Sequence, residues 1–261
     1  MLKLLRQKWF LVLVIGVLLY FVATRILGVS ESFFPVLIIL GAFIVPVTFV
    51  TYIGEYERRL DKGQHTIIPP SSIVWSFIAG GMIGVIGAGI LEFATLRSLG
   101  IPQLFAVGFI EEGAKLILPV VIFLRRNYQS EADGLLFGIV SGMGFAALET
   151  IGYGFITFMQ SQGSMGSVEQ VLIARGLFSP AGHAAWTGLV CAVLWRERKK
   201  AGHMVFNLVI VATFILAVVL HASWDIVSSV NSFLITMLGY LVIATISITL
   251  LIRRMREARS L

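Results

Sequence analysis

Eight long apolar segments follow one another along the chain, and the connections between them are short and polar. A bilayer core of ~30 Å needs ~20 mainly apolar residues to cross it as a helix. Each segment meets that requirement, so the sequence predicts an all-α, polytopic membrane helical bundle. The expected spans are 9–28, 33–53, 72–96, 101–124, 134–158, 169–195, 204–226 and 232–252.

The composition agrees with a membrane protein. Hydrophobic residues make up 57% of the 261 and charged residues only 13%, whereas about a quarter of the residues in soluble domains are charged. The single cysteine, Cys191, excludes an internal disulfide and a cysteine-based zinc site. Pro69-Pro70 followed by Ser71-Ser72 predicts a serine cap at the start of the third span.

Loop charge orients the bundle. With the N-terminus in the cytoplasm, 16 of the 20 lysines and arginines fall on the inner side, as positive-inside topology requires. Both termini are then cytoplasmic, in a multi-pass protein of the cell membrane whose basic loops face anionic lipid. No nucleic-acid partner is expected, because the basic residues form no single patch or recognition motif. The inner residues are Lys3, Arg6, Lys8, Arg58, Arg59, Lys62, Arg125, Arg126, Arg196, Arg198, Lys199, Lys200, Arg253, Arg254, Arg256 and Arg259; the outer ones are Arg25, Arg97 and Arg175.

The first span resembles a signal peptide in its basic start and apolar stretch. It has no small-residue cleavage site, so we interpret it as an uncleaved helix.

Seven ionisable side chains in the fourth to seventh predicted spans are candidates for a buried site. Each costs a few kcal/mol at membrane depth, so each needs a partner, a wet cavity or a neutral form. They come from four consecutive spans and are Glu111, Glu112, Lys115, Glu149, His183, His221 and Asp225.

Spacing indicates which of these groups meet. Lys115 follows Glu111 by four residues and Glu112 by three, so either carboxylate can share a helix face with the ammonium group. Asp225 follows His221 by four, which suits a carboxylate that fixes the tautomer of an imidazole.

Small residues predict how the central helices pack. Gly134, Gly138, Gly142, Ala146 and Gly154 recur at multiples of four and form a ridge for close helix packing. Glu149 falls near this ridge and is expected to face protein. The glycine-rich third span is its expected neighbour, and Pro180 predicts a kink beside His183. With the predicted topology, the polar groups gather from mid-membrane towards the outer face.

Each feature also has a structural interpretation when taken alone. The Glu111–Lys115 pair can be a structural ion pair, Asp225 a helix cap and Glu149 a polar contact between helices. We interpret four tryptophans near span ends as interfacial belt residues, namely Trp75, Trp186, Trp195 and Trp224. For the combined set, a proton-coupled transporter or lipid-handling protein and a non-catalytic scaffold remain alternatives to an enzyme.

The same residues resemble the motifs of the PrsW family of intramembrane proteases, relatives of the CAAX prenyl protease and bacteriocin-immunity superfamily. "EEGAK" is similar to the family's Glu-Glu-x-x-Lys/Arg motif, and "FAALE", ending in Glu149, to its Phe-x-x-x-Glu motif. His183 follows in the next span. "HASWD" is similar to the last motif, His-x-x-x-Asp. The resemblance covers about residues 72–226. It divides the chain into two N-terminal helices with a cytoplasmic loop (1–71), a protease core (72–226) and a last helix with a basic tail (227–261).

The resemblance implies hydrolysis of a peptide bond near the outer membrane face, in a single-pass membrane protein such as an anti-sigma factor. Relatives with a histidine at the end of the second motif work as metal-independent glutamate proteases. Here Glu149 stands at that position, so the group that activates water stays open.

We expect Glu111 or Glu112 to act as general base, with a proton shared between them. Lys115 would keep one carboxylate charged, and His221 would donate to the oxyanion or the leaving group. Glu149 and His183 would complete the water or substrate site. In a zinc variant, Glu149, His183, His221 and one of the first two glutamates supply the ligands.

Overall fold

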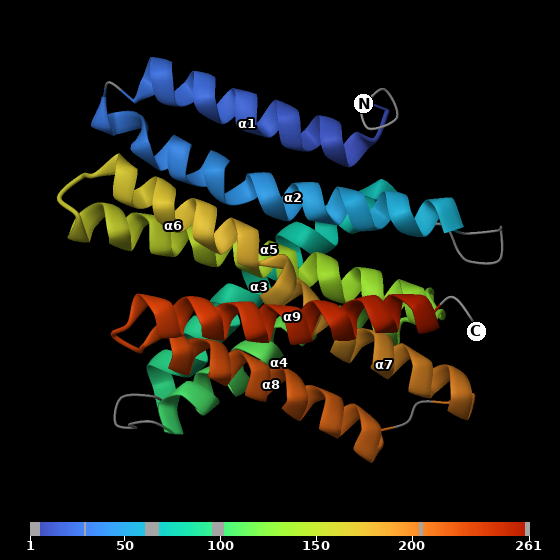
Figure 1. Cartoon of the computed structure of the whole chain (residues 1–261). Helices are drawn as coiled ribbons and strands as arrows, with labels where there is room; N and C mark the ends of the chain where they lie inside the picture. The colour runs from blue at the N-terminus through green and yellow to red at the C-terminus, as the bar shows by residue number, and fades with distance from the viewer. Residues whose placement is uncertain (1–5, 29, 61–67, 96–101, 204–205, 259–261) are drawn as a thin grey trace. The chain divides into compact units, whose positions relative to one another are not determined.

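The computed structural model describes residues 6–28, 30–60, 68–95, 102–203 and 206–258. All regular structure in these ranges is helical, as the sequence predicts (Figure 1). A 3-10 turn, Glu31–Phe33, precedes α2, and a π-helical turn, Pro180–Ala184, joins α6 to α7. The α-helices are α1 (Lys8–Leu27), α2 (Phe34–Leu60), α3 (Pro70–Thr95), α4 (Pro102–Leu124), α5 (Glu131–Gln160), α6 (Met165–Phe178), α7 (Ala185–Ala201), α8 (Leu208–Ser228) and α9 (Phe233–Glu257).

Seven segments in the described ranges are long and apolar enough to cross a membrane. One of them, Met165–Ala201, is α6, the π-turn and α7 taken together. The remaining predicted span, 101–124, is α4. This helix has 23 residues but carries three charged side chains near its middle. Many large apolar side chains on these helices are exposed, and lipid accommodates them better than water. The protein is therefore a polytopic, multi-pass membrane bundle.

The topology of the termini stays a prediction. Four of the charges used for it, Lys3, Lys62, Arg97 and Arg259, lie outside the described residues. Two others are not simple loop charges, because Arg198 and Arg254 are buried. Arg198 donates to the carbonyls of Phe123 and Tyr128, and Arg254 pairs with Glu131.

The start of α3 differs from the serine cap that the sequence suggests. The helix begins at Pro70, and the backbone N–H groups of Ser72 and Ile73 donate to the Pro69 carbonyl. Proline suits the first helical position, because its fixed φ is helical and the N–H that it lacks would have no partner there. Both serines therefore lie inside the first turn.

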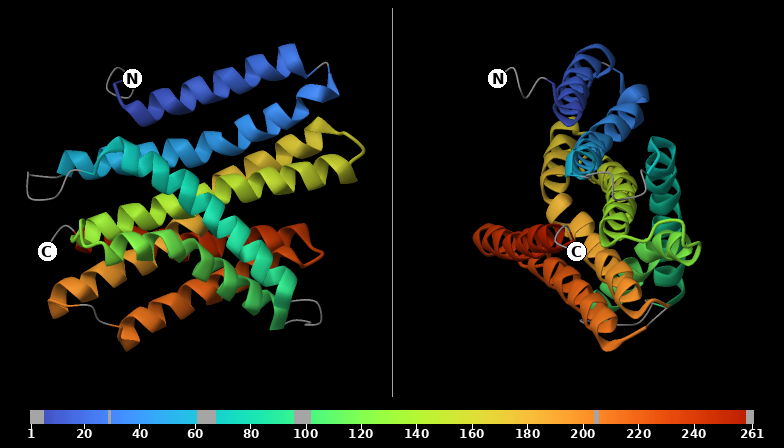
Figure 2. Two further views of the ribbon diagram at one scale, coloured as in Figure 1. Left: turned by 180° about the vertical axis from the view of Figure 1, so that it is seen from behind. Right: turned by 90° about the vertical axis from the view of Figure 1, so that its right-hand side faces the viewer.

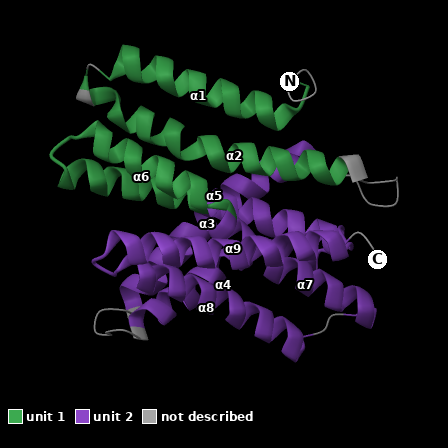
Figure 3. Cartoon of the chain, in the orientation of Figure 1, with its two compact units in different colours: residues 1–63, 146–180 green, residues 64–145, 181–261 purple. Residues whose placement is uncertain are grey.

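The chain forms two compact units (Figure 3). Unit 1 consists of residues 1–63 and 146–180, and unit 2 of residues 64–145 and 181–261. In unit 1, α2 packs against α1 and α6. Its apolar core contains Ile38, Ala42, Val168 and Leu172.

Unit 2 is built around the first part of α5, whose residues are almost all buried. One face of α5 contacts α7 and the π-turn before it: a Cβ atom would lie 2.6 Å from the Thr187 carbonyl oxygen if placed on Gly138, and 2.3 Å from the His183 carbonyl oxygen if placed on Gly142. Another face of α5 packs closely against α3, the neighbour that the sequence predicts. A Cβ atom on Gly144 would lie 2.0 Å from the Phe77 carbonyl oxygen. Figure 2 shows α3 lying obliquely across α4 and this part of α5. Helix α8 packs against α4, α7 and α9.

The glycine contacts generate a stability prediction. Alanine in place of glycine inside a helix normally stabilises it by about 0.5–1 kcal/mol. We expect the opposite for Gly144→Ala, because backbone atoms of α3 must move, and such overpacking costs ~1–3 kcal/mol. The measurement is the Tm of the full chain in detergent. The control is Gly89→Ala, whose new Cβ meets nothing within 4 Å. Equal Tm values for the two variants would contradict the packing described.

Candidate active site

The candidate site begins with a buried ammonium group on α4. Lys115 is fully buried, and its Nζ lies 2.7 Å from Glu112 Oε1 and 3.2 Å from Glu111 Oε2. The same Nζ lies 4.3 Å from the ring centroid of Phe145 on α5, a cation–π contact. Both carboxylate pairs that the spacing predicts are thus present. Phe145, the first residue of the second motif, contributes to this arrangement in addition to apolar packing.

A proline shapes the backbone at this point. Pro119 lies inside α4 and has no N–H, so the carbonyl of Lys115, four residues earlier, loses its helical partner. Ser141 of α5 replaces that partner, since its hydroxyl donates to the Lys115 carbonyl at 2.8 Å. The residue that carries the buried charge is therefore fixed to α5 through its backbone as well as its side chain.

Helix α8 brings an imidazole to the two carboxylates. His221 Nδ1 donates to Glu112 Oε1 at 2.8 Å, with the proton on the nitrogen because an ionised carboxylate only accepts. The other ring nitrogen, Nε2, lies 3.6 Å from Glu111 Oε2 and 3.6 Å from Asp225 Oδ2. The spacing predicted Asp225 as the carboxylate that orients the ring. Asp225 does face it, but Glu112 makes the shorter contact.

Exposure is graded across this Glu–Lys–His–Asp cluster of unit 2. The side chains of Lys115 and Glu112 are 0% and 1% exposed, whereas those of Glu111 and Asp225 are 11% and 26% exposed. The cluster is therefore most enclosed at Lys115 and Glu112 and most exposed at Asp225, while the Glu111 Oε2 atom itself is buried.

His183 lies in the π-helical turn that follows Pro180. A π-turn inserts an extra residue into a helix and is frequent at functional sites. The imidazole is half-buried, with ring centroids 5.6 Å from Phe145 and 6.1 Å from His221, the latter edge-on. The predicted irregularity at Pro180 is confirmed, and it brings the second histidine next to the first.

The belt interpretation is wrong for two of the tryptophans. Trp186 and Trp195 are almost fully buried. Trp186 stacks on His221 with ring centroids 5.1 Å apart, and its Nε1 donates to Ser247 on α9. The contact joins α7 to α8, and nothing in the local sequence pattern signals it. Only Trp75, which is 69% exposed, has the exposure of a lipid-facing residue.

Glu149 belongs to unit 1, one turn after Phe145 along α5. Its carboxylate pairs with Arg175 of α6 at 2.6 Å. Arg175 also donates to Thr150 Oγ1 and lies over the Tyr153 ring, 4.0 Å from its centroid. The loop-charge pattern places Arg175 among the outer charges, because a contact between different helices leaves no trace in local spacing.

Comparison with known proteins agrees with the motif analysis. Residues 68–252 match a family model described as PrsW family intramembrane metalloprotease. One similar curated protein is Protease PrsW of Shouchella clausii (strain KSM-K16), which is 27% identical over 163 residues. The aligned region covers 59% of this chain and 68% of that protein. No solved structure matches the chain.

The charge balance of the cluster predicts the effect of removing its cation. Lys115→Met would leave Glu112 buried without its ammonium partner, which typically costs ~3–5 kcal/mol. We expect a large fall in Tm, and adding Glu112→Gln to the same chain should restore part of it.

The matched control is Lys200→Met, because Lys200 is 59% exposed and Glu197 keeps its contacts with Arg196 and Asn207. Exposed pairs contribute ~1 kcal/mol or less. A fall in Tm of the same size for both lysine variants would contradict the account of Lys115.

Proposed function

The chain belongs to the PrsW family of intramembrane proteases, and from this premise we propose that the Glu–Lys–His–Asp cluster of unit 2 hydrolyses a peptide bond. The observation that carries the proposal is the position of His221. Each ring nitrogen of His221 has a carboxylate within 3.6 Å. Two of these carboxylates, Glu111 and Glu112, also pair with the buried Lys115. Amide hydrolysis needs an activated water, a stabilised oxyanion and a proton for the leaving nitrogen.

The two adjacent glutamates are suited to different tasks. Glu112 Oε1 contacts both Lys115 and His221, and the side chain is 1% exposed, so we assign it to positioning. Glu111 is more accessible and its Oε2 faces His221 Nε2, so we assign it as the general base. The sequence alone left this choice between the two glutamates open.

The proposed reaction conserves its protons. Glu111 takes a proton from water as the oxygen attacks the carbonyl carbon, and the resulting oxyanion is stabilised by nearby donors. His221, which must begin the reaction with a proton on each ring nitrogen, then gives the proton on Nε2 to the leaving nitrogen as the C–N bond breaks. The proton held by Glu111 returns to the ring and restores the site. Asp225, which is also 3.6 Å from Nε2, would stabilise the ring while it is charged.

We keep His183 and Glu149 in the proposed site as residues that bind substrate or water. The ring contact between His183 and His221 supports the first assignment. The second rests on the family motif, because in unit 1 Glu149 is paired with Arg175.

A metal fits the donor set of unit 2, and the family description includes metalloprotease activity. Imidazole nitrogen and carboxylate oxygen are zinc ligands. His221 already donates from Nδ1 to Glu112, which is how metal-ligating histidines are usually oriented. In a metal-assisted variant of the site, Glu111 and His183, whose ligand atoms lie within 4.8 Å of each other, would hold the ion, with His221 as a further ligand. A bound zinc would polarise the carbonyl group and favour deprotonation of water.

For the substrate, we propose a single-pass membrane protein that is cut near the outer membrane face, with an anti-sigma factor as the specific case. The predicted topology supports the outer face. The motifs that support the protease assignment also make it the preferred function over the transporter interpretation.

The first prediction of this proposal concerns the two glutamates. Glu111→Gln should lower cleavage on the order of 10²–10⁴-fold, as expected for loss of a general base, with a smaller fall in Tm than Glu112→Gln, because Lys115 keeps its closer carboxylate. Glu112→Gln should lower both cleavage and Tm, because Lys115 and His221 lose a shared partner. The measurement compares new protein termini in membranes that hold equal amounts of native chain or variant.

Glu169→Gln is the matched control, since Glu169 is a glutamate of α6 that accepts a long hydrogen bond, 3.5 Å, from the Tyr20 hydroxyl. New termini near outer membrane boundaries should persist with it and disappear with Glu111→Gln. Identical termini for the native chain and the Glu111→Gln/Glu112→Gln double variant would reject the protease mechanism and favour flux assays.

The second prediction concerns the metal. We expect the purified full chain to retain about one zinc per chain by elemental analysis, in line with a protease-type zinc site. His221→Gln should lose the metal, while the exposed His203→Gln should keep it. Full cleavage activity at negligible metal content, unaffected by chelators, would reject the zinc assignment and leave the glutamate mechanism.

A further inference from the structure

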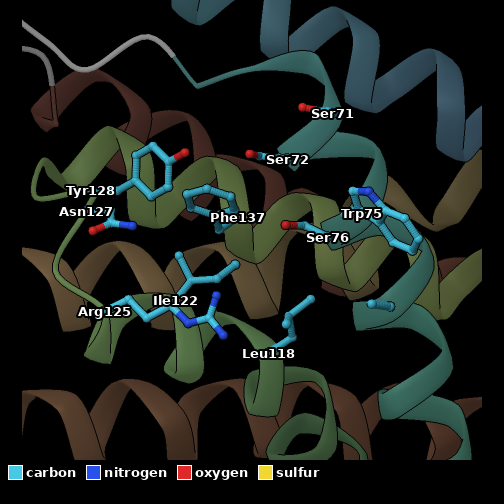
Figure 4. A pocket seen from close by; sticks show the side chains of 11 residues that line it. Ser71, Ser72, Trp75, Ser76, Leu118, Ile122, Arg125, Asn127, Tyr128 and Phe137 are labelled. Carbon is cyan, nitrogen blue, oxygen red and sulfur yellow. The ribbon is translucent and has the colours of Figure 1, made fainter.

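A cavity in unit 2, apart from the Glu–Lys–His–Asp cluster, lies between the start of α3 and the end of α4. It has a volume of about 380 Å³, within the range of roughly 300–1,000 Å³ typical of small-molecule sites. Figure 4 shows side chains from α3, from α4 and the loop after it, and from α5 directed towards this space. None of its lining residues belongs to the cluster described above.

The lining of this cavity is amphipathic. Its apolar part is formed by Trp75, Leu118, Ile122 and Phe137. The polar part contains one cation, Arg125, with hydroxyl and amide groups around it, and no acidic residue lines the cavity. In Figure 4 the Arg125 side chain extends alongside Ile122, and the hydroxyls of Ser72 and Ser76 point into the same space. An occupant with an anionic head and an apolar body complements this lining.

The cavity lies where three helices begin or end. Helix α3 starts at Pro70, α4 ends at Leu124 and α5 starts at Glu131. Arg125 is the first residue after α4, so the cavity's cation stands where an apolar span gives way to a polar loop. Trp75, one turn into α3, is exposed at this level. Amphipathic aromatic and basic side chains are typical of the headgroup region of a bilayer.

The loop that forms the polar rim is fixed in place. The Tyr128 carbonyl accepts hydrogen bonds from Trp195 Nε1 at 3.0 Å and from Arg198 Nη2 at 2.7 Å. Arg198 Nη1 also donates to the Phe123 carbonyl, near the end of α4. At the start of α5, Ser130 and Asp133 exchange backbone-to-side-chain hydrogen bonds. These contacts fix the backbone on both sides of Arg125, which lines the cavity.

We propose that this cavity binds an anionic phospholipid of the surrounding bilayer. The phosphate would contact the Arg125 guanidinium and the serine hydroxyls, and the glycerol and first acyl carbons would lie along Trp75, Leu118 and Ile122. With the predicted topology the lipid comes from the cytoplasmic leaflet, whose anionic lipids attract basic residues. The site is independent of the proposed peptidase mechanism, because it shares no residue with it.

The test is lipid binding to the purified full chain, measured by native mass spectrometry. The probes are dioctanoyl phosphatidylglycerol, dioctanoyl phosphatidylcholine and inorganic phosphate. We expect the first molecule of phosphatidylglycerol to bind more tightly than phosphatidylcholine. Arg125→Gln should weaken that binding about five-fold or more, the factor expected for ~1 kcal/mol per basic residue near an anionic surface.

Arg126→Gln is the matched control, because it removes the same charge from the neighbouring residue, which does not line the cavity. It should leave phosphatidylglycerol binding unchanged. Ser72→Leu narrows the cavity without changing its charge, so it should weaken the binding of phosphatidylglycerol. Tm values for all three variants check that the fold is intact.

Three results would overturn the proposal. Equal loss in the two arginine variants would show general charge attraction instead of a site. Equal affinity for the two lipids in the native chain would remove the role of the anionic head. Displacement of phosphatidylglycerol by millimolar inorganic phosphate would identify a free-anion site.

Discussion

The buried ammonium group of Lys115 is the constraint on which the rest of unit 2 depends. A cation without solvent is stable only if opposite charge surrounds it, and here two carboxylates of the same helix and the face of Phe145 do so. The ring must come close to α4, and α3 must leave room for it. Gly84 of α3 provides that room, because a Cβ atom there would lie 2.8 Å from the Phe145 ring. The polar cluster and the glycine packing are thus parts of one arrangement.

A buried ion pair is weak evidence for stability, since desolvation of the two ions offsets most of their attraction. Apolar residues of similar volume would hold α4, α5 and α8 together equally well. The retention of Glu112, Lys115 and His221 in the interior therefore points to chemistry. The exposure gradient supports this interpretation, because the groups that fix Nδ1 are fully enclosed and the most exposed member of the cluster, Asp225, faces Nε2.

The sequence predicts the helices and the contacts within a helix. The all-α fold, the pairing of Lys115 with both glutamates and the approach of Asp225 to His221 follow from apolar length and from i, i+3 and i, i+4 spacing. Contacts between helices were missed. Glu112 and His221 are 109 residues apart, and Arg175 reaches Glu149 from another helix. Trp186 was assigned to the membrane boundary because its place in the sequence says nothing of which side chain it stacks on.

The backbone departs from regular α-helix next to the ionisable residues of the cluster and next to His183. Pro119 frees the carbonyl of Lys115, and the π-turn after Pro180 carries His183. In hydrocarbon a freed carbonyl costs several kcal/mol, so such irregularities persist only where protein or water supplies a partner. The Ser141 hydroxyl is that partner for Lys115. Pro119 and Ser141 thus act on the same group, because one removes the helical partner of the Lys115 carbonyl and the other replaces it. By the same reasoning, the contact between α4 and α5 must exclude lipid. A carboxylate that is proposed to activate water inside a membrane needs such a lipid-free environment.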